Sequence, residues 1–172
     1  MEKDGRYKKI KPLFRDKVVR KFSEIFSEEV IPKTVLADDL KKNNNQIGKL
    51  IKSPGGFKVR DLFRIIERSE LSIEQLVQLF ESDYQDDYKV DNPGKNKGYK
   101  HIKTMFNDGA INIFSDIFDH VPETTVAEDI GKRKAKIDLA KLTYTQVDRI
   151  AKLCELTKAD IFQLIAAQLN NK

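Results

Sequence analysis

The sequence predicts an all-α fold built from two copies of one helical unit. Three observations support this prediction: apolar residues recur at spacings of three and four, glycine and proline are scarce, and a stretch near the N-terminus recurs in the second half of the chain. With 8 glycines and 5 prolines among 172 residues, an architecture of strands joined by frequent turns is disfavoured. A hydrophobic content of 40% is sufficient for a core.

The repeat sets the expected domain boundaries. Gly5 to Phe26 aligns with Gly98 to Phe118, and the match is clearest where Phe22-Ser23-x-Ile25-Phe26 recurs as Phe114-Ser115-x-Ile117-Phe118. The alignment continues from 34–51 to 124–141 and, after a short deletion in the second copy, from 59–80 to 144–165. We therefore predict a first unit over 1–82, a linker over 83–97 and a second unit over 98–172.

Each unit is expected to hold about five short helices. In the first, one apolar stripe with helical spacing consists of Val18, Val19, Phe22, Ile25 and Phe26. Ser72 with Gln75 and Thr143 with Gln146 have the spacing of a capping box, in which a hydroxyl and an amide satisfy backbone N–H groups at a helix start. Pro54-Gly55-Gly56 predicts a break between helices.

Within each unit the residues for a sharp helical hairpin follow one another. Such a hairpin needs a small residue where two helices meet, a permissive turn and apolar anchors on the inner faces. In the first copy the candidates are Ala37, Leu40, Ile47 and Leu50. In the second copy they are Ala127, Ile130, Ile137 and Ala140, with Gly131 at the turn, where a positive φ costs glycine little.

These stretches resemble the lambda-repressor and Cro type of helix-turn-helix, the xenobiotic-response-element family of regulators. The second copy has the family's alanine, glycine and isoleucine at Ala127, Gly131 and Ile137, whereas the first has Lys41 in place of the glycine. The resemblance implies two recognition helices, near 43–51 and 133–141, that enter the major groove. Because the two differ in sequence, the implied target site is asymmetric.

The resemblance also implies the residues that contact DNA. Amides suit adenine, whereas cations suit guanine or phosphate. The predicted DNA-binding residues are Asn43, Asn44, Asn45, Gln46 and Lys49 in the first unit, with Lys52 beside them, and Lys132, Arg133, Lys134, Lys136 and Lys141 in the second. Residues 1–21 add nine basic against three acidic side chains, a local charge of +6 that suits phosphates. We expect a non-enzymatic double-stranded DNA-binding protein that regulates transcription, as a monomer with a pseudo-twofold repeat or a homodimer.

Other interpretations of the same residues stay open. The run Asn43 to Asn45 also suits a turn, because asparagine tolerates left-handed backbone, and the basic clusters also suit a solvated surface. Carboxylates that would repel phosphate lie on or before the proposed recognition helices, at Asp38, Asp39, Glu128, Asp129 and Asp138. The alternative function is therefore a helical module for protein–protein interaction, with the same fold and no affinity for DNA.

The sequence favours neither catalysis nor a cofactor. His101, His120 and Cys154 do not share a metal-binding spacing, and Gly55-Gly56 lacks the lysine of a phosphate-binding loop. Cys154 aligns with Ser69, which predicts a small buried residue, and a single cysteine allows no internal disulfide. No apolar run is long enough to span a membrane or to act as a signal peptide, so we expect a cytoplasmic protein.

Overall fold

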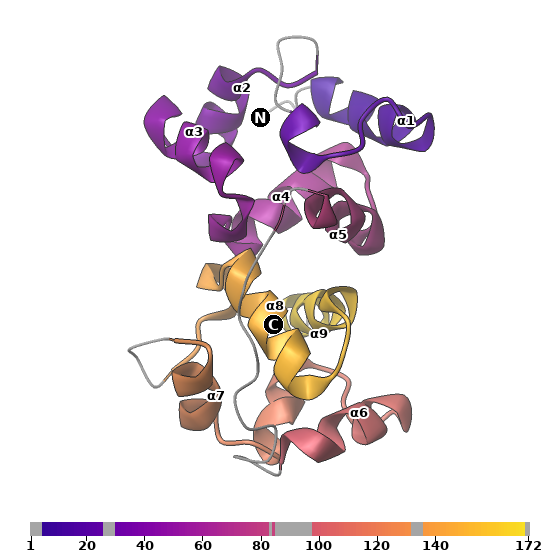
Figure 1. Cartoon of the computed structure of the whole chain (residues 1–172), viewed down its shortest axis with the longest axis vertical. Helices are drawn as coiled ribbons and strands as arrows, with labels where there is room; N and C mark the ends of the chain where they lie inside the picture. Colours follow the sequence, from indigo (N-terminus) through magenta and orange to yellow (C-terminus); the bar gives the residue numbers. More distant parts are fainter. Residues whose placement is uncertain (1–4, 26–29, 83, 85–97, 132–135, 171–172) are drawn as a thin grey trace. The chain divides into compact units, whose positions relative to one another are not determined.

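The computed structural model describes residues 5–25, 30–82, 84, 98–131 and 136–170, and the chain divides into two compact units, 1–85 and 86–172 (Figure 1). Every regular element of the described residues is a helix, which confirms the predicted all-α class. No helix among them combines the length and apolar character needed to cross a bilayer. The two units are described separately below.

The described residues of the first unit form five α-helices and three 3-10 segments. The α-helices are α1 (Ile10–Arg15), α2 (Lys33–Leu40), α3 (Asn44–Lys52), α4 (Val59–Ser69) and α5 (Ile73–Glu81). The 3-10 segments are Gly5–Lys9, Phe22–Ile25 and Pro54–Gly56. The break predicted at Pro54 is therefore a 3-10 turn, because proline is tolerated in a first turn but cannot continue a preceding α-helix.

An aromatic cluster forms the centre of the first unit. The Phe22 ring lies 5.2 Å from that of Phe57 and 4.1 Å from that of Phe80, measured between centroids. All three side chains are fully buried, as are Leu36 of α2 and Ile47 of α3. Phe22 is thus buried as the periodicity predicts, whereas Val18 is exposed, because the chain leaves helical geometry after α1 and the stripe is interrupted.

The second unit has α6 (Tyr99–Asn107), α7 (Glu123–Asp129), α8 (Tyr144–Cys154) and α9 (Lys158–Asn170), with 3-10 segments Phe114–Asp119 and Leu139–Lys141. Helices α8 and α9 pack against each other, with the rings of Tyr144 and Phe162 5.8 Å apart. The described part of this unit therefore has four α-helices rather than the five expected.

The capping boxes predicted from spacing are confirmed. Ser72 Oγ accepts from the Gln75 N–H at 3.1 Å while Gln75 Oε1 accepts from the Ser72 N–H at 2.9 Å. Thr143 and Gln146 repeat this exchange at 3.2 and 3.1 Å. These boxes start α5 and α8 by satisfying N–H groups that have no partner inside the helix.

The two units place left-handed residues at positions that align in sequence. Three such pairs occur: Lys17 with Gly109, Lys41 with Gly131, and Glu70 with Glu155. A left-handed residue ends a helix or a helical turn, because it turns the next N–H back toward the last free carbonyls. The same chain reversals therefore occur in the same order in both halves of the sequence.

Candidate nucleic-acid interface

Helices α2 and α3 form the helical hairpin that the sequence predicts for the first unit (Figure 1). The anchors Ala37, Leu40 and Ile47 are buried, and Leu50 is half-buried rather than fully buried. Lys41 ends α2 in the left-handed conformation, with φ 56° and ψ 46°. The Lys42 N–H then donates to the Ala37 carbonyl at 2.9 Å, which closes the end of α2 and directs the chain into α3.

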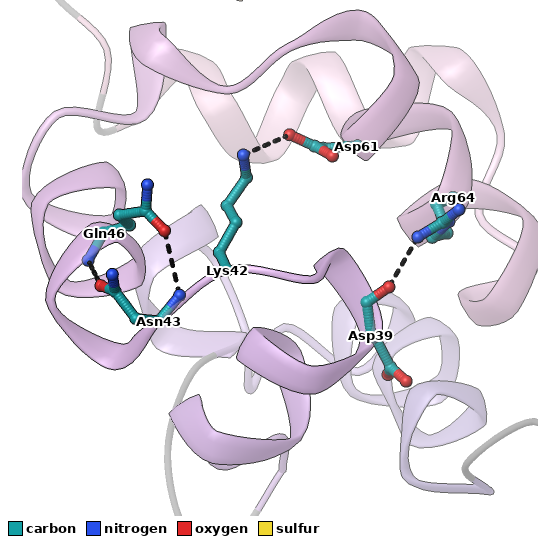
Figure 2. A network of polar contacts seen from close by, with 6 residues as sticks. All are labelled: Asp39, Lys42, Asn43, Gln46, Asp61 and Arg64. Carbon is teal, nitrogen blue, oxygen red and sulfur yellow. Dashed lines mark hydrogen bonds and ion pairs between the residues drawn. The ribbon is translucent and has the colours of Figure 1, made fainter.

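Asn43 and Gln46 start α3 with a third capping box (Figure 2). Asn43 Oδ1 accepts from the Gln46 N–H at 2.8 Å, and Gln46 Oε1 accepts from the Asn43 N–H at 3.0 Å. Asn43 has extended backbone, φ −84° and ψ 166°, so the asparagine run is a helix start and not a left-handed turn. Two of the four predicted base-contacting amides thus have a structural role, which their own three-residue spacing could have revealed.

The outer face of α3 consists of Asn44, Asn45, Gly48, Lys49 and Lys52. Asn45, Lys49 and Lys52 follow one another at helical spacing and are exposed, as is Asn44 at the first position of the helix. No acidic residue occurs anywhere in α3, and both lysines lie in its last turn. The predicted site residues Asn44, Asn45 and Lys49 therefore share one solvent-facing surface of amides and positive charge.

A polar network ties this hairpin to α4 (Figure 2). The Lys42 ammonium lies 3.6 Å from the carboxylate of Asp61, whose side chain is 6% exposed. Arg64 Nη1 donates to the Asp39 carbonyl at 2.6 Å, at the C-terminal end of α2, where the helix dipole favours a cation. The network holds the turn and the end of α2 against α4, and thereby fixes the direction of α3.

Asp39, one of the carboxylates expected to repel phosphate, is paired within the first unit. Its carboxylate is 2.9 Å from Arg68 Nη1, and both side chains are largely buried, at 15% and 17% exposure. The Arg68 guanidinium also lies over the Tyr7 ring, 5.7 Å from its centroid. The negative charge of Asp39 is therefore compensated within the unit, whereas Asp38 is exposed.

The basic residues near the N-terminus are on the surface of the first unit. Lys17 has left-handed backbone, and its carbonyl accepts from Arg20 Nε at 3.0 Å. Arg15 Nε lies 3.4 Å from the carboxylate of the adjacent Asp16, and both side chains are well exposed. Lys3 and the Arg6 side chain lie outside the described residues. The exposed basic side chains are Lys8, Lys9, Lys11, Arg15, Lys17, Arg20 and Lys21.

The prediction of a second recognition helix over 133–141 is wrong for the residues that the structure describes. Lys136, Ile137 and Asp138 are not helical, and Leu139–Lys141 is a single 3-10 turn. The predicted contacts Lys132, Arg133 and Lys134 lie outside the described residues. Lys136 and Lys141 are exposed, but neither is presented by an α-helix.

The physical reason is the place of the deletion between the two copies. The 3-10 turn Leu139–Lys141 matches Pro54–Gly56, because each is followed by a buried residue of nearly equal backbone angles, Leu142 with ψ 140° and Phe57 with ψ 133°. Eleven residues, 42–52, precede the turn segment in the first unit, but only six, 132–137, do so in the second. Six residues cannot contain both the turn and a nine-residue helix such as α3.

The short segment of the second unit is held by α7 and by its own side chains. The Ile137 N–H donates to Glu123 Oε2 at 2.7 Å, and Asp138 Oδ1 accepts from the Ala140 N–H at 3.2 Å. Lys141 Nζ lies 4.0 Å from the same Asp138 carboxylate. Asp138 therefore caps a 3-10 turn, and it does not lie on a helix facing DNA.

Metal-ligating side chains do not gather in the described part of the chain. No group of three or more histidine, cysteine, aspartate or glutamate side chains suited to a metal ion occurs there. Cys154 is buried in α8, as its alignment with Ser69 predicts, and burial raises the pKa of its thiol to about 12. Comparison of the chain with models of protein families, with curated proteins and with solved structures found no match.

Proposed function

We propose that this protein binds double-stranded DNA through its first unit, with α3 in the major groove, and regulates transcription. The observation that carries the proposal is the outer face of α3, where exposed Asn44, Asn45, Lys49 and Lys52 project from the second helix of a tight helical hairpin. A major groove about 12 Å wide admits one α-helix, and amide and cationic side chains match base edges and phosphates.

Three features of the unit suit an anionic partner. Helix α3 begins at a capped N-terminus, where the helix dipole is positive, and it contains no carboxylate. The carboxylate of Asp39 is paired with Arg68. Exposed lysines and arginines of α1 and the following loop add positive charge on the same unit, which raises affinity for phosphates and makes it depend on salt.

A single hairpin of this kind among the described residues changes the expected stoichiometry. The second unit has too few residues for a counterpart of α3, so the proposal gives one half-site to each chain. Two half-sites about 34 Å apart would then require a homodimer. A single half-site would be bound by a monomer.

Fluorescence anisotropy with labelled genomic duplexes over about 50–200 mM salt tests the proposal. We expect affinity to fall as salt rises, and Lys49→Ala to weaken binding. Lys141→Ala is the matched control, because it also removes an exposed lysine but from the second unit. Binding that is independent of salt, or that responds equally to both substitutions, would contradict the proposal.

A second candidate function is protein–protein interaction, which the altered second unit favours. A unit that keeps its buried core but has no room for a recognition helix keeps its fold without the element that contacts bases. We propose this role for the second unit only. Anisotropy with the same duplexes also tests it, because Lys136→Ala should leave the isotherm unchanged.

A further inference from the structure

Two residues of the α2–α3 hairpin differ from those that the fold alone would favour. Gly48 lies in the interior of α3, where alanine would stabilise a helix better. Lys41 has the left-handed conformation that glycine adopts at lower cost. Departures of this kind from local preference are expected where a residue serves function rather than stability.

Nothing in the described part of the first unit accounts for the missing side chain of Gly48. A Cβ atom built on this residue meets no atom within 4 Å, so it points into open space. Gly98 of the second unit shows the opposite case, because a Cβ there would lie 2.1 Å from the His120 carbonyl oxygen. No described atom of the chain would clash with a side chain at residue 48. The reason for the glycine therefore lies outside the unit.

Lys41 differs from the residue that aligns with it in the second unit. The aligned residue there is Gly131, with φ 82°, whereas Lys41 has φ 56°. The Lys41 side chain is exposed. The unit that has α3 therefore carries a positive charge at a strained turn, and the unit without room for α3 carries the glycine that the turn prefers.

Gly48 lies at the centre of the surface that the proposed function uses. On a helix, residues three and four apart are neighbours, so Asn44, Asn45 and Lys52 surround it. An α-helix with its side chains is about 10–12 Å across, which nearly fills the major groove. Removing one side chain from the centre of the leading face lets the helix backbone come closer to the base pairs.

We propose that the duplex contacts the backbone of α3 at Gly48 when α3 lies in the major groove, and that Lys41 binds a phosphate at the edge of the groove. This inference rests on the proposed function. Lys49 and Lys52, which both follow Gly48 in α3, place positive charge beside this contact, and this charge favours DNA over an acidic protein surface, because phosphates line the groove at regular intervals. The glycine makes α3 less stable than alanine would, but it allows closer contact between the helix and the duplex.

The test measures stability and duplex affinity of the same variants of the full chain. Gly48→Ala is expected to raise the melting temperature and to weaken binding about tenfold, the scale of one disfavoured contact at a protein–DNA interface. Gly48→Leu is expected to weaken binding more strongly, by about a hundredfold, with the helical circular dichroism retained. Lys41→Gly is expected to raise the melting temperature and to reduce the slope of log affinity against log salt by about 0.9.

Glu70→Gly is the matched control. Glu70 has the same left-handed conformation, φ 61°, but ends α4 rather than α2. Its replacement should raise the melting temperature without weakening binding.

The outcomes separate this inference from the proposed function. If the unmodified protein binds no duplex, both are overturned. If it binds duplex with the expected salt dependence but Gly48→Ala and Gly48→Leu bind equally well, the close contact is overturned and the proposed function stands. A Gly48→Ala variant less stable than the unmodified protein would also overturn the inference, because the glycine would then have a reason within the fold.

Discussion

Replacing Asn43 by alanine should destabilise the first unit through the start of α3. The substitution removes the side-chain oxygen that accepts from the Gln46 N–H at 2.8 Å and leaves that N–H without its cap. Loss of an N-terminal cap typically costs about 1 kcal/mol. For a unit of this size, a loss of 1 kcal/mol lowers the melting temperature by about 4–8 °C.

Two measurements check this prediction. Thermal unfolding followed by far-ultraviolet circular dichroism gives the shift of the melting temperature, and hydrogen exchange by nuclear magnetic resonance gives the local effect. The Gln46 amide should lose protection in Asn43→Ala, whereas amides of α9 in the second unit should keep theirs. The loss of protection at the Gln46 amide should exceed the loss of global stability, because only the first turn of α3 depends on the cap.

Controls distinguish capping from DNA contact. Asn43→Ser keeps a capping oxygen and should have nearly the original melting temperature. Asn44→Ala removes the adjacent exposed amide, which is not a cap, and should leave stability unchanged but weaken duplex binding. An Asn43→Ala protein with the original melting temperature and full protection at Gln46 would refute the assignment of Asn43 to the helix start.

Three further substitutions or treatments follow from the packed interior. Gly98→Ala should destabilise the second unit by about 1–3 kcal/mol in urea unfolding, because the new Cβ would lie 2.1 Å from the His120 carbonyl oxygen; an unchanged midpoint would contradict this. Cys154 at pH 8 should react with iodoacetamide about a thousandfold more slowly in the native chain than in urea, since burial raises its thiol pKa from 9.0 to about 12. The unfolded thiol ionises first, so the free energy of unfolding should fall between pH 9 and 12, and a constant value there would count against that pKa. Arg68→Leu should cost about 1–3 kcal/mol in the same urea assay, because it leaves the largely buried Asp39 carboxylate without its partner at 2.9 Å; equal stability would show the pair to be unimportant.

The deletion between the copies shows why sequence alignment misplaced an element. Gly131 and Ile137 fit the helix-turn-helix pattern in spacing, but Ile137 is half-buried in a segment that is not helical. The six residues 132–137 carry too few apolar positions to reveal a period, so sequence places the gap equally well on either side of them. Burial of Leu142 and the backbone of Leu139–Lys141 place the gap within the segment that corresponds to α3.

The network of Asp39, Arg64 and Arg68 shows a second limit. Arg64 contacts a carbonyl 25 positions earlier in the chain, and Arg68 contacts the carboxylate of the same residue. Charged side chains at such separations give no periodic signal, because their pairing depends on how α4 crosses α2. Sequence therefore identified Asp39 as a carboxylate near the hairpin, and only the packed unit shows that it faces α4.

By itself, the sequence determined what depends on neighbouring residues: the helical class, the burial of Phe22 and Ile47, and the capping boxes at Ser72 and Thr143. These follow from local geometry, since a helix repeats every 3.6 residues and a cap acts over three. Tertiary structure decided which charges meet, which surface α3 leaves exposed, and that the deletion between the two copies falls in the segment that corresponds to α3. Those outcomes depend on contacts between distant segments, whose positions are fixed only when the core packs.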